Sequence, residues 1–261
     1  MASTPIKIAI IDMYDDTSNL GMVCIVDIIK HWSKQRSIDL EYQIFSLRNK
    51  GEIPDHSFDI YLSSGGPGSP IDSEGNAWDN LYVKWLQDML LIKKPVLLIC
   101  HSFQIACRHF NFGNVCLRKS TQIGVLPVHP LVEDPIFANL NDPFYSLESR
   151  LYQIIEPNDE NINALGAKII ALEKHRPHVP LERAIMAIKF SDKMYGVQFH
   201  PEGEQNVLLG FFNEEKMKRN IIDNFGEQKW EVIISKLMDP EKLPKTHAHF
   251  IPNFLNLAFG N

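Results

Sequence analysis

The stretch Pro95-Val96-Leu97-Leu98-Ile99-Cys100-His101-Ser102-Phe103-Gln104 decides the fold class. Its apolar run, Val96 to Ile99, opens with a proline and is too short for a helix, so it predicts a buried strand. From Ser102 onward the spacing of apolar residues is helical. The side chains that can face a core are Phe103, Ile105, Ala106 and Phe110. A buried strand that turns sharply into a helix is a building unit of α/β proteins.

Cys100 stands at the turn between this strand and this helix. The first N–H groups of a helix point toward a side chain in that position, and their dipoles favour a thiolate, the nucleophilic form of cysteine. Cysteine is also among the most buried residue types and often only packs. From this stretch alone, a nucleophile and a packed thiol are equally good interpretations.

The composition of the 261 residues limits the class of protein. With 44% hydrophobic and 22% charged residues, the chain can form one large α/β domain, or one domain with an appendage. A net charge of −6 argues against nucleic-acid binding, which needs a clustered basic face. No apolar run approaches the roughly 20 residues that span a bilayer, so no membrane partner is expected.

The N-terminus and the cysteines predict a cytoplasmic protein. Residues 1–5 lack the charged and apolar regions of a signal peptide. The cysteines have neither CxxC nor metal-finger spacing, which predicts reduced thiols. They are Cys24, Cys100, Cys107 and Cys116.

The first half of the chain alternates between strand and helix patterns. Apolar runs predict strands over Lys7–Asp12, Leu40–Leu47 and Phe58–Ser63. Helical spacing predicts helices over Leu20–Trp32 and Ala77–Ile92. Such alternation predicts an open, mostly parallel sheet with helices on both faces.

The second half contains short strand patterns without predicted helices between them. These strands are Ile123–Val128, Tyr152–Ile155, Ile169–Leu172, Ala184–Phe190 and Met194–Phe199. Their close succession predicts a mixed or antiparallel edge on the sheet.

Two loops are expected between these strands. Asn141–Glu148 is predicted to be a polar loop, and Lys174–Pro180 a loop broken by proline. His175 and His178 have a spacing that could hold a metal, but no cysteine or acid joins them, so a solvated loop is favoured.

A glycine-rich segment, Ser64-Gly65-Gly66-Pro67-Gly68-Ser69-Pro70, directly follows the predicted strand Phe58–Ser63. Three glycines and two prolines cannot continue a strand or start a helix interior. Loops at the carboxyl ends of strands hold the sites of open α/β sheets, and glycine lets backbone N–H groups approach a ligand. The lysine of a phosphate-binding GxxxxGK[ST] loop is absent.

His200 and Glu202 end the last predicted strand, in Met194-Tyr195-Gly196-Val197-Gln198-Phe199-His200-Pro201-Glu202-Gly203. Residues two apart on an extended chain project to the same side. The carboxylate can therefore orient the imidazole, and the imidazole can take a proton from a nucleophile. An isolated His-Pro turn would be an ordinary surface turn. With the glycine-rich loop and Cys100 also at strand ends, the nucleophile interpretation of Cys100 is favoured.

Together these segments resemble the class I glutamine amidotransferases. Members of that family have a glycine-rich loop after a strand, a G-x-C-x-G-x-Q nucleophile turn and a C-terminal H-x-E pair. Here these are similar to Ser64–Gly68, Leu98–Gln104 and His200–Glu202. The resemblance covers about residues 6 to 203, in a layout similar to the amidotransferase portion of guanosine monophosphate synthetases.

The resemblance implies a role for each matching residue. Cys100 would be the nucleophile, His200 the acid and base, and Glu202 the residue that orients His200. Backbone N–H groups of Gly66 and His101 would hold the oxyanion, and Gln104 would contact the amino-acid head of the substrate. Gly65 would belong to the same oxyanion and substrate-binding group. The family needs no metal or organic cofactor for this reaction. Its substrate would be glutamine or another γ-glutamyl compound, and its partner a separate synthetase subunit or a second copy of the chain in a homodimer.

Several positions depart from the family pattern. Leu98 and Ser102 replace the two glycines of the nucleophile turn, and His101 stands where an apolar residue or tyrosine is usual. The segment Ser146–Arg150 lacks the histidine of the family's Ser-His pair. Two alternatives therefore stay open. One is a γ-glutamyl hydrolase that acts on a different amide, and the other is an inactive binding or regulatory module with the same fold.

The 58 residues after Gly203 are predicted to form a helical extension, residues 204–261, packed on an amidotransferase-like domain of residues 1–203. Glu204–Phe225 predicts one helix or two, Glu227–Met238 another helix, and Phe250–Phe259 a short apolar segment. Packing on the α/β body is favoured over a surface for a partner or a second copy. If it were such a surface, Phe250, Phe254, Leu255 and Phe259 would be exposed and would form the apolar centre of the interface.

Overall fold

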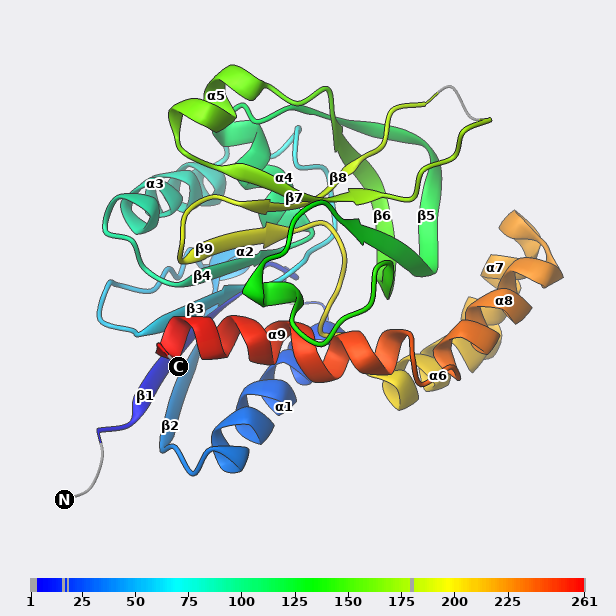
Figure 1. The fold of residues 1–261 in the computed structure, drawn as a ribbon, viewed down its shortest axis with the longest axis horizontal. Helices are drawn as coiled ribbons and strands as arrows, with labels where there is room; N and C mark the ends of the chain where they lie inside the picture. Colours follow the sequence, from blue (N-terminus) through cyan, green and yellow to red (C-terminus); the bar gives the residue numbers. More distant parts are fainter. Residues whose placement is uncertain (1–3, 16, 18, 179–180, 261) are drawn as a thin grey trace.

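A computed structural model describes residues 4–15, 17, 19–178 and 181–260 of the chain. Over these residues, one nine-stranded sheet has the order β2-β1-β3-β4-β9-β8-β7-β5-β6. Helices cover both faces, and a group of C-terminal helices extends from one side (Figure 1). The predicted α/β class, with a mixed edge and C-terminal helices, is confirmed.

The sheet has a parallel half and an antiparallel half. The neighbouring strands β2, β1, β3, β4 and β9 run parallel, and the pairs β9–β8, β8–β7, β7–β5 and β5–β6 are antiparallel. The parallel strands are β1 (Ile6–Asp12), β2 (Leu40–Ser46), β3 (Ile60–Ser63), β4 (Val96–Ile99) and β9 (Met194–Val197). The antiparallel strands are β5 (Asn114–Pro130), β6 (Phe144–Ile155), β7 (Lys168–Glu173) and β8 (Ile185–Lys189).

The strands β1, β3, β4 and β9 of the parallel half are buried on both faces because they alternate between two hydrophobic cores, whereas the edge strand β2 is mostly exposed. In β1, Ile8 and Ile10 face one core, and Ala9 and Ile11 face the other. The first core lies under α1 (Leu20–Gln35) and α9 (Leu243–Phe259), and includes the short helix η1 (Pro135–Phe137). The second lies under α2 (Leu47–Lys50), α3 (Ala77–Leu91) and α4 (His101–His109), and also receives Ile162 of α5 (Asp159–Ala164).

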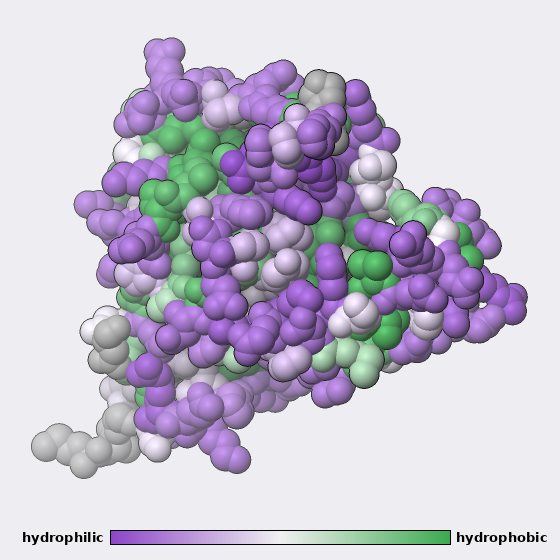
Figure 2. Space-filling model, turned by 45° about the vertical axis from the view of Figure 1, so that its right-hand side comes forward, coloured by the Kyte–Doolittle hydropathy of each residue, from purple (hydrophilic) through white to green (hydrophobic). Residues whose placement is uncertain are grey.

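A third, smaller core joins the antiparallel half to the C-terminal helices. Val125 of β5 and Leu147 of β6 pack there against the helices α6 (Gln205–Asn213), α7 (Glu215–Phe225) and α8 (Glu227–Leu237). In Figure 1, α7 and α8 project from the body at the right. Figure 2 shows a mostly hydrophilic face, with apolar and hydrophilic residues intermixed on this projection. Met238, directly after α8, is 63% exposed.

Helix α9 crosses the body below the sheet (Figure 1). Phe250 and Phe254 are buried in the core that α1 also covers, and Asn256 accepts a hydrogen bond of 2.8 Å from Trp32 of α1. Phe259 is 43% exposed. The apolar residues of this segment therefore pack mainly on the α/β body. A division of the chain after Gly203 stays a prediction.

Most predicted elements are present, with shifted ends. The helix after Cys100 begins at His101, the Glu204–Phe225 segment forms two helices, and Phe250–Phe259 is the second half of a 17-residue helix. The prediction of a loop over Asn141–Glu148 was wrong from Phe144 onward, because β6 begins there. Helix α5, between β6 and β7, was not predicted.

The predicted loop Lys174–Pro180 is irregular over residues 174–178, and residues 179 and 180 lie outside the described part. Residues 1–3 of the N-terminal stretch also lie outside it. Within the described residues, no helix is both long and apolar enough to cross a membrane, and the four cysteines are free thiols.

Candidate active site

Cys100 occupies a strained turn between β4 and α4. Its φ of 48° and ψ of −97° lie outside the regions that non-glycine residues ordinarily adopt. The turn is held from both sides, because the Cys100 N–H bonds to the Val197 carbonyl at 2.7 Å and its carbonyl accepts the Gln104 N–H at 2.9 Å. The Cys100 side chain makes no capping hydrogen bond at the start of α4. Strain of this kind is retained where the surrounding structure fixes a functional side chain.

His200 and Glu202 follow β9, the strand beside β4. His200 Nδ1 and Glu202 Oε1 are 2.8 Å apart, and the Glu202 side chain is only 2% exposed. A hydrogen bond of 2.8 Å from the His200 N–H to the Leu147 carbonyl fixes the backbone of the pair. Since Nδ1 faces the carboxylate, the other ring nitrogen is the one available to Cys100.

The pKa of His200 is raised well above its ordinary value. Burial alone would lower it, but the Glu202 carboxylate and the Cys100 side chain, which also hydrogen-bonds the ring, together outweigh burial. The site therefore favours a protonated imidazole between a carboxylate and a sulfur. This is the form that can give a proton to a leaving group.

The glycine-rich loop, Ser64–Pro70, packs against His200 and Cys100. A Cβ on Gly65 would stand 2.8 Å from His200 Cε1 and 3.5 Å from Cys100 Cβ, and a Cβ on Gly66 would collide with the Met13 carbonyl. A side chain at either position would therefore displace His200 or the loop after β1. The loop is positioned by a bond of 3.0 Å from the Ser64 N–H to the Ile11 carbonyl.

Ser102, which replaces a glycine of the family turn, is accommodated by its neighbours. Its hydroxyl donates to the Ser64 carbonyl at 2.5 Å and lies 2.7 Å from the hydroxyl of Ser63, which also accepts from Tyr82 at 2.7 Å. Leu98 packs fully buried in the core under α3 and α4. The side chain of Ser102 thus links the nucleophile turn directly to the base of the glycine-rich loop.

A cavity of about 530 Å³ opens over these groups. Cys100, Gly66, His200 and Glu202 line one part of it. The remaining walls come from the segment after β1, the start of α1, the middle of β6 and helix α6. Their lining residues are Tyr14, Thr17, Asn19, Leu20, Gly21, Cys24, Pro67, Leu147, Ser149, Gly203, Val207, Leu208, Phe211 and Glu214.

The family model of class I glutamine amidotransferases matches residues 25–208, which include Cys100, His200 and Glu202. This chain belongs to the class I glutamine amidotransferases.

Individual relatives are distant from this amidotransferase. The glutamine-hydrolysing GMP synthase of Chlorobaculum tepidum is 25% identical over 197 residues, which are 73% of this chain and 34% of that protein. The chain thus spans about a third of the length of that relative.

Two solved structures show the same fold. A glutamine amidotransferase from Thermotoga maritima superposes with a TM-score of 0.70 at 15% identity, over 99% of this chain and 100% of the other. A glutamine amidotransferase from Methylobacillus flagellatus gives 0.62 at 14% identity, over 97% of this chain and 94% of the other.

His101 and Gln104 of this amidotransferase lie behind the cavity wall. His101 is 1% exposed, its ring stands 6.4 Å from the Trp78 ring, and it is not among the described residues that line the cavity. A role for its backbone N–H stays a prediction. Gln104 donates to Gln198 Oε1 at 3.2 Å, and it is not among the described residues that line the cavity. Contact of Gln104 with a substrate stays a prediction.

Gln198 joins Gln104 to the nucleophile, and it was not predicted as a site residue. Its side chain is fully buried, and its amide donates toward Cys100 Sγ at 3.7 Å. A donor in this position stabilises a thiolate. The alternation of β9 and its extension places Gln198 on the same side as His200, so period-two spacing could have identified it.

The segment Ser146–Arg150, where the family histidine is missing, alternates between the cavity and the interior. Leu147 and Ser149 line the cavity. Glu148 and Arg150 face inward and form a buried ion pair of 2.9 Å. The segment therefore contributes one apolar side chain and one hydroxyl to the cavity.

Cys24 is a second thiol in the cavity wall. Burial raises its pKa to about 11; a hydrogen bond with the Glu204 backbone opposes this rise, and the charge of Glu202 adds to it. At neutral pH it stays a protonated thiol, which is a poor nucleophile. Of the two cysteines in the cavity, Cys100 alone has the helix start and the His200 ring beside it.

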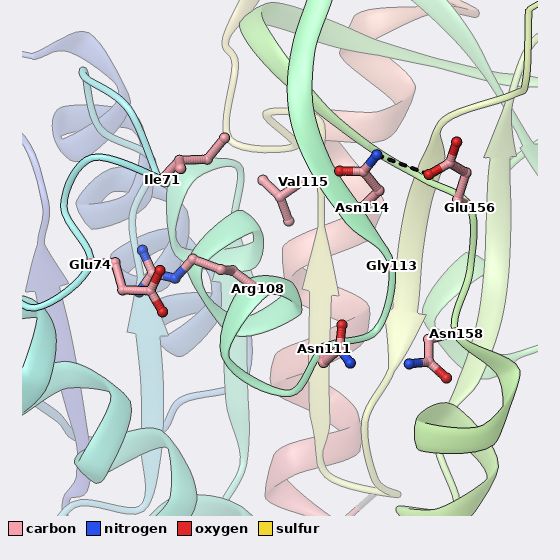
Figure 3. Close-up of a pocket in the computed structure, with 9 residues that line it drawn as sticks. All are labelled: Ile71, Glu74, Arg108, Asn111, Gly113, Asn114, Val115, Glu156 and Asn158. Carbon is pink, nitrogen blue, oxygen red and sulfur yellow. Dashed lines mark hydrogen bonds between the residues drawn. The ribbon is translucent and has the colours of Figure 1, made fainter.

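A separate cavity of about 460 Å³ lies at the other end of α4 (Figure 3). It is lined by Arg108, Glu74 and several asparagines, and Asn114 donates to Glu156 there at 2.9 Å. The Arg108 guanidinium is paired with Asp79 at 2.6 Å. Its described lining residues include no cysteine, serine, threonine or histidine, so the cavity does not repeat the arrangement of Cys100 and His200.

Proposed function

We propose that this chain hydrolyses the side-chain amide of glutamine through a cysteine thioester, producing glutamate and ammonia. The observation that carries the proposal is the strained Cys100 turn beside the 2.8 Å His200–Glu202 pair, at the edge of a cavity large enough for a substrate. Membership of the amidotransferase family supports the same reaction.

In the first half of the reaction, Cys100 attacks the amide carbon. His200 carries the thiol proton to the nitrogen, the C–N bond breaks and ammonia leaves, while Glu202 holds the imidazole in place. The backbone N–H groups of Gly66 and His101 stabilise the oxyanion, and one such donor is worth about 2.7–4 kcal/mol in mutational tests. Water then attacks the thioester, His200 takes its proton and returns it to the sulfur, and glutamate departs.

The ammonia acceptor is proposed to be bound by a separate synthetase subunit. The basis is the similarity to a GMP synthase about three times as long as the matched region, in which a synthetase activity accompanies glutamine hydrolysis. The exposed apolar residues of the α7–α8 projection, Phe225, Val232 and Met238, are candidates for the contact with that subunit.

A γ-glutamyl hydrolase is the second candidate. It is favoured by the apolar wall that Leu20, Val207 and Phe211 add to the cavity beside the catalytic pair. Glutamine itself offers no apolar group beyond its short side chain, whereas the amine of a larger γ-glutamyl amide could pack on this wall.

The test measures glutamate release by the full chain from glutamine and from a series of γ-glutamyl alkylamides. We expect Cys100→Ala to lose at least about a thousandfold in rate, because the nucleophile cannot be replaced. Cys116→Ala, which removes a half-buried thiol outside the cavity, should retain the wild-type rate. Equal rates for Cys100→Ala and wild type would refute the proposal, and a preference for alkylamides over glutamine would favour the second candidate.

A further inference from the structure

Tyr14, in the segment directly after β1, brings a hydroxyl group to the catalytic centre. The side chain is 8% exposed and lines the same cavity as Cys100 and His200. Its hydroxyl oxygen is 3.1 Å from the position that a Cβ on Gly65 would take. That same position is 2.8 Å from His200 Cε1 and 3.5 Å from Cys100 Cβ. The phenol, the base and the nucleophile therefore surround one backbone position.

A second glycine, Gly21, borders the other side of the Tyr14 hydroxyl group. A Cβ on Gly21, in the first turn of α1, would be 3.2 Å from the Tyr14 oxygen and 3.1 Å from Glu202 Oε1. Glu202 Oε2 is buried and has no hydrogen-bond partner among the described residues. The hydroxyl thus lies between the glycine-rich loop and the start of α1, next to the carboxylate that orients His200.

The segment that carries Tyr14 is held in place by its own hydrogen bonds. The Tyr14 N–H donates to Asp12 Oδ1 at 2.8 Å, and its carbonyl accepts from the Thr17 hydroxyl at 2.5 Å. The Met13 N–H donates to the Ser64 hydroxyl at 3.0 Å, which ties this segment to the glycine-rich loop. The ring is therefore positioned by both of the loops that form the site.

The phenol stays protonated at the pH of any ordinary assay. Burial, then the charges of Glu202, Cys100 and Asp12, raise the pKa of Tyr14 well above its usual value. Asn19 hydrogen-bonds the phenol and opposes this rise, but less strongly. A neutral hydroxyl both donates and accepts a hydrogen bond, which a phenolate cannot do.

We propose that Tyr14 is a further catalytic residue. Its hydroxyl group hydrogen-bonds first the leaving nitrogen and then the attacking water, the two groups that exchange a proton with His200. The inference rests on the proposed amide hydrolysis. In the first half, the Tyr14 oxygen accepts an N–H of the leaving nitrogen while His200 protonates that nitrogen and the C–N bond breaks. In the second half, the Tyr14 hydroxyl donates to the oxygen of the attacking water while His200 removes the water proton. The phenol keeps its own proton throughout, so the atoms and charges of the reaction are unchanged.

The test compares Tyr14→Phe with Tyr61→Phe. Both substitutions remove only a phenolic oxygen from a buried ring, and the Tyr61 hydroxyl bonds to the Asp55 carbonyl at 2.8 Å, outside the cavity. In glutamate release from glutamine, Tyr14→Phe should lower kcat roughly ten- to a hundredfold, the effect of one hydrogen bond to a charged group. KM should change less than kcat, and Tyr61→Phe should keep the wild-type kcat.

Two further measurements separate catalysis from structure. The rate at which iodoacetamide alkylates Cys100 should be the same in Tyr14→Phe and wild type, because Tyr14 acts on the leaving nitrogen and the water and not on the thiol. Incorporation of 4-aminophenylalanine at position 14, which restores a polar hydrogen-bonding group on the ring, should recover part of kcat. This variant also reports on Tyr14 if Tyr14→Phe does not fold.

The possible failures of the two proposals differ. A wild-type kcat in Tyr14→Phe, or no recovery with 4-aminophenylalanine, would overturn the role of Tyr14 and leave the amide hydrolysis intact. If wild type and Cys100→Ala release glutamate equally slowly from every γ-glutamyl amide, the proposed hydrolysis is refuted, and the role of Tyr14 falls with it.

Discussion

His101 is a buried histidine next to Cys100 in the sequence, and His200 is a mostly buried histidine beside Cys100 in the fold. Their surroundings shift their pKa values in opposite directions. Burial, with Arg48 and Arg108 nearby, lowers the pKa of His101 to about 3. Burial would also lower that of His200, but Glu202 and Cys100 raise it above its usual value. His101 is therefore a neutral packing residue, whereas His200 can carry a proton.

The difference shows that charged neighbours determine whether a histidine can carry a proton. Burial and distance from the nucleophile in the sequence matter less. His101 is covalently next to Cys100, yet its ring faces Trp78 and its Nε2 has no partner among the described residues. His200 is 100 residues away from Cys100 in the sequence, and parallel pairing of β4 with β9 brings it to the sulfur. A titratable group needs a charge partner and a place in the cavity to do proton chemistry.

The largest expected effect is on activity, in the matched pair His200→Gln and His101→Gln. His200→Gln removes the group that moves the proton, so the rate of glutamate release should fall about 10²- to 10⁴-fold. His101→Gln keeps the backbone N–H beside the substrate and should stay within a few-fold of wild type. Steady-state kinetics with glutamine measures both. Comparable losses in the two variants would show that the His101 ring takes part in the reaction.

The second expected effect is on the pH dependence of the unfolding free energy, and its sign differs between His101→Gln and His200→Gln. The folded pKa of His101 lies below its unfolded value, so the unfolded state binds the extra proton as the pH falls from about 6.5 toward 3. Wild type should then lose roughly 1 kcal/mol of unfolding free energy per pH unit relative to His101→Gln. His200 has the opposite shift. Its contribution is fully present below pH 6.5 and disappears as the pH rises through its folded pKa.

Urea denaturation of wild type and both variants between pH 4 and 9 measures these contributions. The stability of wild type relative to His101→Gln should decrease toward acid, and its stability relative to His200→Gln should decrease toward alkali. Parallel pH profiles for the two variants would contradict the opposite pKa shifts.

The residues that could be predicted from the sequence are those whose pattern is local. Four apolar residues before Cys100 predicted β4. The spacing of His200 and Glu202 predicted that their side chains meet, and they are 2.8 Å apart, although Glu202 lies in a turn after β9 and not on an extended segment. The order of these motifs along the chain was also sufficient to predict the family.

The residues that could not be predicted depend on partners far away in the sequence. The first residues of β6, up to Glu148, were predicted as a polar loop. The burial of Glu148 in an ion pair with Arg150 is a property of the folded sheet. Helix α9 contains Pro252 in its interior, which in isolation disfavours a helix, and packing on α1 outweighs this. Tyr14 carries no motif, and only the fold places its hydroxyl beside Gly65.

The smallest expected effect concerns a third histidine, His247 of α9, which acts on the catalytic pair from outside the cavity. Its Nδ1 donates to the backbone carbonyl of Glu202 at 3.0 Å, so α9 supports the turn that carries His200. Replacement by phenylalanine should lower the unfolding free energy by about 1 kcal/mol, the net value of one hydrogen bond. Glutamate release should fall only a few-fold, since His247 holds the position of Glu202 and moves no proton.

His249→Phe, two residues along the same helix, is the matched control and should leave both quantities nearly unchanged. A loss in His247→Phe as large as that in His200→Gln would mean that the C-terminal helix sets the geometry of the catalytic pair. No loss of rate at all would mean that β9 and the Leu147 contact position the pair without α9. The expected intermediate result would place His247 between His200, which reacts, and His101, which only packs, and would give the C-terminal helix a measurable share in the catalytic geometry.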